Sequence, residues 1–404
     1  MNRVYLYDGI RSPFGKYGGE LSTTRPDDLM AYILKKLVER NNNIKDLIED
    51  VVIGDSNQAG EDSRNIARNS ALLSGISINS GGITVNRLCG SGLAAVHLAT
   101  NSLKCNEGEL YIAGGVESMT RAPLIISKTE KAFTRNIDVA DSTIGWRFPN
   151  KNLLDRFGTH TMPETSDNIG KKLKITRDES DLFAYQSQMK YKNALETGFF
   201  DDEILPFKIL ARNKRENEFI MTADQHPRLN TSLEGLSKLK PINKNGVATA
   251  GNSSGINDGA AAILLGTAAM SNLLGKEPIV EIVAHAVSGV EPMYMGLGPV
   301  KASEKVLKRA GLTINDMDII EINEAFSTQV LGCLKSLKLS FSDSRINPNG
   351  GAIAIGHPLG ASGARLLITA SRELRRIGGK YALVSLCIGI GQGIATIIKN
   401  PDVN

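Results

Sequence analysis

Two distant stretches of the chain share one pattern, and this duplication limits the fold more than any other feature. Cys89-Gly90-Ser91-Gly92-Leu93 can be laid over Gly360-Ala361-Ser362-Gly363-Ala364. Each stretch is followed by a helical pattern and then a strand, and Gly114 lies as far beyond Cys89 as Ser385 lies beyond Gly360. Such self-similarity indicates a duplicated α/β domain whose halves face each other across a pseudo-twofold axis. Cys89 should therefore lie near loops formed by residues beyond 320.

The order of the predicted elements indicates a layered α/β fold. Strand-like apolar runs alternate with helical patterns, and the helices are predicted over 26–40, 65–74, 300–310, 325–337 and 363–377. Between about 120 and 245 the alternation stops and the charge density rises, which indicates an insertion. We expect a duplicated α/β/α/β/α layered core. One half comprises residues 1–120 and 246–272, a loop domain comprises 121–245, and the other half comprises 273–404.

Length, charge and cysteine content exclude several classes of protein. A chain of 404 residues is too long for one simple core. Its net charge of +4 is too small to indicate a nucleic-acid-binding protein. No apolar run reaches membrane-spanning length, and the N-terminus shows no signal-peptide pattern. The four cysteines are too scattered for a disulfide framework, which favours a reducing, cytoplasmic setting.

Cys89 is predicted to lie at a sharp turn between a strand and an apolar, alanine-rich helix. Free backbone N–H groups and the helix dipole at such a turn favour a thiolate. Gly90 and Gly92 allow a tight turn and leave room for a bulky ligand over the sulfur. The alternative is an inert cysteine buried under a glycine-rich turn, as free cysteines commonly are.

The second half of the chain carries three further features. Asn323-Glu324-Ala325-Phe326 directly follows a predicted strand, His357 lies in a loop between Gly356 and Pro358, and Cys387 ends another strand. A nucleophilic cysteine needs a base and a stabilised oxyanion, and this set supplies both if the halves meet. Zinc is the other use of two cysteines and one histidine, and the absence of a C-x-x-C pair argues against it.

With these motifs the chain resembles the thiolase family. The matching motifs occur in the family's order: Asn86-Arg87-Leu88-Cys89-Gly90-Ser91-Gly92, Asn323-Glu324-Ala325-Phe326, Gly356-His357-Pro358-Leu359-Gly360-Ala361-Ser362-Gly363 and Cys387-Ile388-Gly389. The resemblance covers essentially the whole chain. It implies the thiolase fold, a loop domain that covers the active site and binds coenzyme A, and thiolysis of a 3-oxoacyl-CoA to acetyl-CoA and a shortened acyl-CoA. The reverse Claisen condensation is equally implied.

The resemblance also implies roles for individual residues. Cys89 would be the nucleophile that forms the acyl-enzyme, His357 its base, and Cys387 the acid that protonates the departing enolate. His357 and a water held by Asn323 would stabilise the enolate oxygen, and the N–H groups of Cys89 and Gly389 would stabilise the acyl-enzyme oxyanion.

The remaining implied positions bind the substrate. Ser254 and Gly255 would contact the pantetheine arm of CoA and Arg228 its nucleotide end, while Met162 would lie near the acyl group and Phe326 would also bind the substrate. Coenzyme A and acetyl-CoA enter as substrates, and no metal or permanently bound cofactor is expected. Family members form dimers or dimers of dimers, so we expect a homodimer or homotetramer.

Two departures from the commonest patterns bear on the substrate. Ile390 interrupts the glycines that often follow the C-terminal cysteine, and Thr161-Met162-Pro163 lacks the His-Met-Gly of short-chain biosynthetic members. Both are similar to the 3-oxoadipyl-CoA thiolase branch. There Arg147 could pair with the distal carboxylate of a dicarboxylic acyl chain, the alternative being an arginine in a surface ion pair.

Other functions remain open from the sequence. They are a biosynthetic acetoacetyl-CoA thiolase, a decarboxylating ketoacyl synthase and a non-catalytic acyl-CoA-binding relative. Cys387 argues against the synthase, and the retention of Cys89 and His357 argues against the non-catalytic relative. Cys105 and Cys333 fall on predicted helices and are expected to pack there, and His97 and His285 are expected in the core or at an interface.

Overall fold

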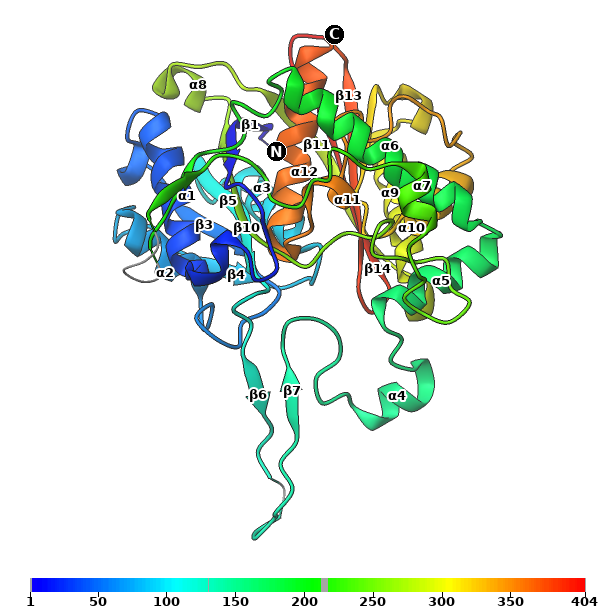
Figure 1. Cartoon of the computed structure of the whole chain (residues 1–404). Helices are drawn as coiled ribbons and strands as arrows, with labels where there is room; N and C mark the ends of the chain where they lie inside the picture. Colours follow the sequence, from blue (N-terminus) through cyan, green and yellow to red (C-terminus); the bar gives the residue numbers. More distant parts are fainter. Residues whose placement is uncertain (1, 130, 212–216, 404) are drawn as a thin grey trace.

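A ten-stranded mixed sheet forms the centre of the molecule, seen in the computed structural model of Figure 1. The structure describes residues 2–129, 131–211 and 217–403. Nine strands follow the order β12-β13-β14-β11-β1-β10-β5-β3-β4, and β2 pairs with β10. Their bounds are β1 Val4–Arg11, β2 Gly15–Lys16, β3 Asp50–Gly54, β4 Ile83–Val85, β5 Leu110–Ser118, β10 Asn257–Thr267, β11 Val280–Gly289, β12 Ile319–Ile322, β13 Tyr381–Ile388 and β14 Gln392–Lys399.

The two halves of the sheet have equivalent strand orders when each is followed outward from the contact between β1 and β11. From that contact outward, β10, β5 and β3 follow on one side, and β14, β13 and β12 follow on the other. The outer pairs β3–β5 and β12–β13 are parallel, and the inner pairs are antiparallel. Among the described residues, the two halves of the sheet are joined by the short pairing of Tyr5 with Glu281 and Leu6 with Val280. The duplication expected from the two glycine-containing stretches is therefore present in the pairing.

Two helices lie between the halves, and further helices cover the outer faces. Helix α3 (Ser91–Lys104) packs on β3 and β5, and α12 (Leu359–Arg376) packs on α3, β5 and β13, so both lie in the middle of Figure 1. An apolar core surrounds this pair. Helices α1 (Pro26–Arg40) and α2 (Ile66–Ser74) cover the N-terminal half, and α9 (Gly298–Ala310) and α10 (Ser327–Ser336) belong to the core of the C-terminal half. The expected layered, duplicated α/β core is confirmed.

Residues 121–245 form several small elements and one long helix. The helices are α4 Lys151–Phe157, α5 Met162–Leu173, α6 Arg177–Glu196 and α7 Leu233–Ser237, and the hairpins pair β6 Leu124–Ile126 with β7 Val139–Asp141 and β8 Phe207–Ile209 with β9 Phe219–Met221. The β6–β7 hairpin projects far from the body as an arm (Figure 1). The proposed limits of the three domains stay a prediction.

Several local expectations differ from the structure. Helix α12 begins at Leu359, four residues before the expected start, since Pro358 ends the preceding loop and Gly360 through Gly363 fit its first turn. Strand β14 was not predicted, because the glycines before it read as a terminal loop. Cys105 does not pack in a helix: it lies just after α3 and is exposed. Cys333 is buried within α10 as expected.

His97 and His285 meet in the interior between α3 and β11, with ring centroids 4.2 Å apart. The expectation of a core position holds for His97, which is buried, whereas His285 is half-buried. Across the described residues, no helix is long and apolar enough to cross a membrane. The short connecting helices are α8 Met270–Leu274, α11 Ala352–Ile355 and the 3₁₀ turns at Glu20–Thr23, Ile44–Asp46, Pro292–Leu297 (η3) and Ile314–Asp316.

Candidate active site

Cys89 lies on a strained turn between the edge strand β4 and helix α3. Leu88 adopts a positive φ of 47°, which is uncommon for a residue with a branched side chain. The Ser91 hydroxyl holds the turn, because it accepts from the Arg87 N–H (2.8 Å) and donates to the Leu88 carbonyl (2.6 Å). A Cβ on Gly90 would lie 2.6 Å from Ile388 Cδ1, and one on Gly92 would overlap the Gly360 carbonyl. The two glycines thus allow the second half of the chain to approach the thiol.

The Cys89 thiol is not the thiolate that the helix terminus predicts. Burial raises its pKa to about 11, and the nearby charge of Glu117 acts in the same direction. The N–H groups of Gly389 and of Cys89 itself lower the pKa, but less than burial raises it. The prediction of a thiolate was wrong because desolvation outweighs these donors. A base must therefore remove the proton before the sulfur can attack.

His357 occupies the loop between α11 and α12 and is held on both ring nitrogens. Asn323 Nδ2 lies 3.2 Å from Nε2, and Ser362 Oγ lies 2.6 Å from Nδ1. With the amide nitrogen as donor, Nε2 accepts and the proton is assigned to Nδ1, which donates to Ser362. Burial lowers the pKa of His357 to about 3, with a smaller contribution from the Arg365 charge. The ring is therefore neutral, with an unprotonated Nε2.

Cys387 lies at the end of β13 within a small apolar cluster. Its neighbours include Met162, Met295 and Phe326, and Ala248 and Ala325 complete the cluster. Burial raises the pKa of Cys387 well above that of a free thiol, and the nearby Cys89 sulfur raises it further. The two thiols therefore lie close enough to interact electrostatically. The turn after β13 places the N–H of Gly389 against Cys89.

The Ser254–Gly255 segment runs beside the Asn323 motif. The Ser254 N–H donates to the Ala325 carbonyl (2.9 Å), and Ser253 forms a bridge with Phe326. A Cβ on Gly255 would overlap the His226 ring, so glycine permits the segment to pass close to the loop that carries Arg228. Arg228 itself is exposed. The predicted CoA-binding residues thus lie on two neighbouring segments.

Arg147 does not form the surface ion pair considered as an alternative. It is half-buried, and its guanidinium donates to Asn57 Oδ1 (3.1 Å) and to the Ser142 carbonyl (2.5 Å). Both partners are neutral oxygens. The pKa of Asp141 is lowered mainly by its hydrogen bonds with Thr143, and the Arg147 charge adds a smaller effect in the same direction.

Sequence reasoning missed three residues at this site. Met295, on η3, belongs to no recognisable sequence motif, and it is part of the site only because the fold packs it in the same apolar cluster as Cys387. Ser362 was quoted as part of a motif, and its position five residues after His357 at a helix start could have indicated a partner for the ring. Glu117 lies one residue before the end of β5, is buried, and accepts from the N–H groups of Gly360 (2.8 Å) and Ser56 (3.1 Å).

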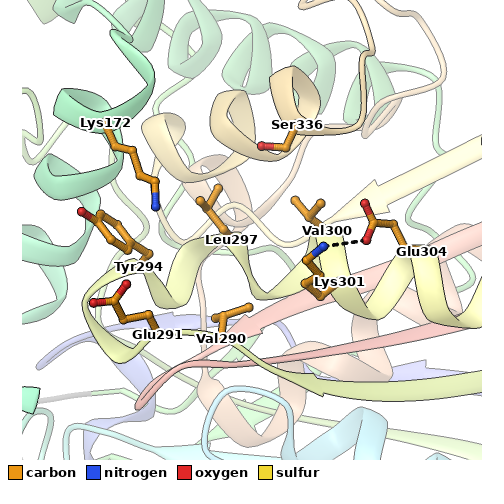
Figure 2. A pocket seen from close by; sticks show the side chains of 9 residues that line it. All are labelled: Lys172, Val290, Glu291, Tyr294, Leu297, Val300, Lys301, Glu304 and Ser336. Carbon is orange, nitrogen blue, oxygen red and sulfur yellow. Dashed lines mark hydrogen bonds and ion pairs between the residues drawn. The ribbon is translucent and has the colours of Figure 1, made fainter.

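A separate cavity of about 370 Å³ is lined by residues of η3, α5, α9 and the end of α10 (Figure 2). Tyr294, Leu297 and Val300 form an apolar floor, and Lys172 lies over the Tyr294 ring at 3.7 Å from its centroid. None of its lining residues is a predicted site residue. In the described part of the chain no group of three or more His, Cys, Asp or Glu side chains could hold a metal ion.

Comparisons with known proteins match the whole chain. The family profile described as thiolase, N-terminal domain, matches residues 4–269, and the one described as thiolase, C-terminal domain, matches residues 276–400. The chain belongs to the thiolase family. It is an acyltransferase of the kind that the four motifs predict, and the expectation of CoA thioesters as substrates agrees with a family member solved with CoA.

The similar proteins include bacterial thiolases named for six-carbon and longer dicarboxylic CoA substrates such as 3-oxoadipyl-CoA. The chain is 50% identical over 401 residues to the Escherichia coli (strain K12) "3-oxoadipyl-CoA/3-oxo-5,6-dehydrosuberyl-CoA thiolase", covering 99% of this chain and 100% of that protein. It is 48% identical over 401 residues to an Acinetobacter baylyi "Beta-ketoadipyl-CoA thiolase", with the same coverage.

Solved structures give the same family. Human mitochondrial 3-ketoacyl-CoA thiolase superposes with a TM-score of 0.91 at 37% identity, covering 99% of both chains. The same enzyme in complex with CoA superposes with a TM-score of 0.90 at 37% identity, covering 99% of this chain and 98% of that chain.

Proposed function

We propose that this thiolase cleaves 3-oxoadipyl-CoA with CoA to give acetyl-CoA and the four-carbon dicarboxylic acyl-CoA. The proposal rests on the approach of Cys387 and of the Gly389 N–H to Cys89, across the two halves, in a chain 45–50% identical over nearly its full length to proteins named for this substrate. Relatives named acetyl-CoA acetyltransferase match at lower identity, 38% over 400 residues, which makes the biosynthetic alternative weaker.

In the first half-reaction His357 Nε2 takes the proton of the Cys89 thiol, and the sulfur attacks the 3-keto carbon. The bond between carbons 2 and 3 then breaks, and its electron pair passes to the acetyl-CoA enolate. Cys387 donates its proton to carbon 2, which releases acetyl-CoA and leaves the acyl group on Cys89. Asn323 and His357 would stabilise the enolate oxygen, through a water on Asn323.

In the second half-reaction the Cys387 thiolate takes the proton of the incoming CoA thiol. The CoA sulfur attacks the acyl carbon, the Cys89 sulfur leaves, and His357 returns its proton. The N–H groups of Cys89 and Gly389 would hold the oxyanion, and the approach of the Gly389 N–H to Cys89 supports this role. Losing one such donor typically raises a barrier by about 3 kcal/mol.

Binding of the substrate is assigned to residues around this centre. Ser254 and Gly255 would contact pantetheine, Arg228 the nucleotide, and Met162 and Phe326 the acyl chain beside Cys387. We assign the distal carboxylate to Arg147, because its guanidinium is bonded to neutral oxygens that a carboxylate could replace. Residues 121–245 would form the loop domain that covers the site.

The substrate is tested by thiolysis assays that compare acetoacetyl-CoA, 3-oxohexanoyl-CoA and 3-oxoadipyl-CoA, with Cys89→Ala as the blank. We expect 3-oxoadipyl-CoA to have the highest kcat/KM, and Arg147→Ala to lower it about tenfold while the unbranched monocarboxylic substrates are unaffected. Equal turnover of 3-oxohexanoyl-CoA and 3-oxoadipyl-CoA would refute the dicarboxylic substrate. Activity equal to the blank on all three would refute catalysis and favour the acyl-CoA-binding alternative.

We also propose a homodimer or homotetramer in the cytoplasm. The β6–β7 arm supports self-association, because Leu124, Ile126 and Val139 are more than half exposed on a hairpin that projects from the body. The cytoplasmic setting rests on four cysteines that are all free and on bacterial relatives. Sedimentation of the intact chain and of the double variant Leu124→Ser, Ile126→Ser tests the arm, with a lower assembly state expected for the variant.

A further inference from the structure

One face of helix α6 contacts both segments that are expected to hold CoA. Asp181 and Gln188 are seven residues apart, so they lie on the same face of the helix, and both are buried. Asp181 contacts the segment that leads to Ser254, and Gln188 contacts the loop of Arg228. Neither residue belongs to a motif on which the proposed function rests.

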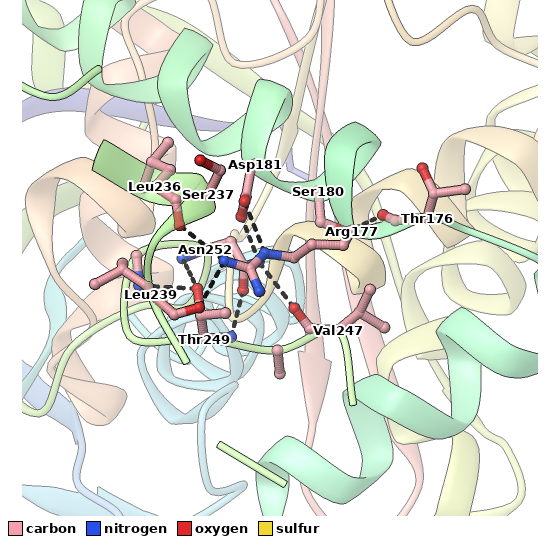
Figure 3. Close-up of polar contacts among 12 residues, drawn as sticks. Thr176, Arg177, Ser180, Asp181, Leu236, Ser237, Leu239, Val247, Thr249 and Asn252 are labelled. Carbon is pink, nitrogen blue, oxygen red and sulfur yellow. Dashed lines mark hydrogen bonds and ion pairs between the residues drawn. The ribbon is translucent and has the colours of Figure 1, made fainter. Parts of the chain in front are cut away.

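Asp181 joins two pieces of chain through its two oxygens (Figure 3). Its Oδ1 accepts from Asn252 Nδ2 at 2.9 Å, and its Oδ2 accepts from Arg177 Nε at 2.7 Å. Arg177 also donates from Nη2 to the carbonyls of Leu236 (2.7 Å) and Leu239 (2.9 Å). Those two side chains cover Gly251, where a Cβ would lie 2.5 Å from each.

Asn252 connects Asp181 to the backbone of the segment that carries Ser254. Its Oδ1 accepts from the Thr249 N–H (2.7 Å), and its Nδ2 also donates to the Val247 carbonyl (3.0 Å), so the whole amide is engaged. The Asn252 carbonyl accepts from the Ser327 N–H (2.9 Å), which ties the segment to the start of α10. The backbone that leads into Ser254 is therefore held at Asn252, and the Ser254 N–H is held by the Ala325 carbonyl.

Gln188 holds the loop that carries Arg228 through hydrogen bonds to the backbone. Its Oε1 accepts from the Arg228 N–H at 2.9 Å, and its Nε2 donates to the Ile353 carbonyl at 3.2 Å. Ile353 belongs to α11, which directly precedes the His357 loop. Helix α6 thus fixes the position of the Arg228 loop relative to the segment that carries Ser254.

We propose that Asp181 and Gln188 are positioning residues for coenzyme A, and that Asp181 acts through Asn252. The inference rests on the proposed function of the Ser254 and Arg228 segments. Because neither side chain reaches the thiols, their loss should weaken binding of CoA without slowing the chemistry at Cys89. A purely structural role would instead lower stability and leave the affinity for CoA unchanged.

The test measures KM for CoA, kcat, the dissociation constant of CoA by calorimetry, and the rate at which iodoacetamide alkylates Cys89. We expect Asp181→Ala and Gln188→Ala each to raise KM and Kd for CoA about tenfold, the size of effect typical when buried hydrogen bonds that hold a binding segment are lost. kcat at saturation and the alkylation rate should stay within about twofold of the wild type. Glu196→Ala, in an exposed ion pair with Lys192 at the other end of α6, serves as the matched control and should change none of these.

A double-mutant cycle decides whether Asp181 acts through Asn252. If it does, Asp181→Ala combined with Asn252→Ala raises the Kd for CoA no more than the worse single change. Fully additive effects would overturn the inference, and so would wild-type affinity in Asp181→Ala. If that variant does not fold, Asp181→Asn replaces it, since the amide keeps one acceptor for Asn252, and the expected Kd lies between wild type and Gln188→Ala. A wild-type chain that binds no CoA overturns the proposed function itself.

Discussion

Ser362 offers a sharp test of His357, because the serine touches only one side of the ring. Its hydroxyl lies 2.6 Å from Nδ1 and donates to the Pro358 carbonyl at 2.9 Å, and both side chains are buried. When Nε2 takes the Cys89 proton, the ring becomes a cation whose Nδ1–H bond is charge-assisted. Such bonds contribute about 1.5–3 kcal/mol, so Ser362→Ala should raise the barrier by that amount. This corresponds to a loss in kcat/KM of about 10- to 150-fold.

The same helix provides the control. Ser371 is also buried, and its hydroxyl bonds the carbonyl four residues earlier, at Leu367 (2.6 Å), as Ser362 bonds Pro358. Ser371→Ala removes this back-bond without touching the histidine, so both variants should lose similar thermal stability. Thiolysis of a 3-oxoacyl-CoA, followed by the loss of substrate absorbance, should be impaired only in Ser362→Ala. If the two variants differ less than twofold in kcat/KM, the assignment of the proton to Nδ1 and of the base to His357 is wrong.

Three further changes test the surroundings of the site. Burial raises the pKa of Glu117 from 4.5 to about 7, so between these pH values the folded state binds more protons than the unfolded state and its stability falls as the pH rises. Glu117→Gln lacks this titration, so its melting temperature relative to that of the wild type should rise between pH 5 and pH 8. A difference in melting temperature that stays constant over this range would contradict the argument. Gly115→Ala would place a Cβ on the Gly360 carbonyl, so we expect a loss of about 4 kcal/mol or more in denaturant unfolding, whereas Gly289→Ala, with its nearest atom at 3.9 Å, should cost less than about 1 kcal/mol. Ile390 has a φ of 64°, costly for a β-branched residue, so Ile390→Gly should stabilise the chain by up to about 1 kcal/mol, and an unchanged or lower melting temperature would refute the strain.

The duplicated core could be predicted because its signal is repeated in the chain. The glycines around Cys89 and Gly360 mark the same strand-to-helix turn, and the structure places α3 and α12 together where those turns meet. The helix over 26–40 was found to the residue, since Pro26 starts it and the apolar spacing is regular. The meeting of Cys89 with residues beyond 320 follows from the pseudo-twofold axis alone.

What could not be predicted depends on burial. The thiolate expected at Cys89 ignored desolvation, which no local pattern reveals. Strand β14 was missed because Gln392 and the glycines around it suggest a loop, although its pairing with β11 and β13 buries it. Asp181 and Gln188 look like an ordinary polar helix face, and only the fold turns that face inward.

The position of β10 has a consequence for synthesis of the chain. This strand lies between β1 and β5, yet about 140 residues separate it from the end of β5. At ribosomal rates of about 5–20 residues per second, the N-terminal half waits on the order of ten seconds for its central strand, with the edges of β1 and β5 that face β10 unpaired. A nascent chain stalled before residue 257 should therefore expose apolar strands and depend on chaperones, and it would carry Cys89 long before its base exists.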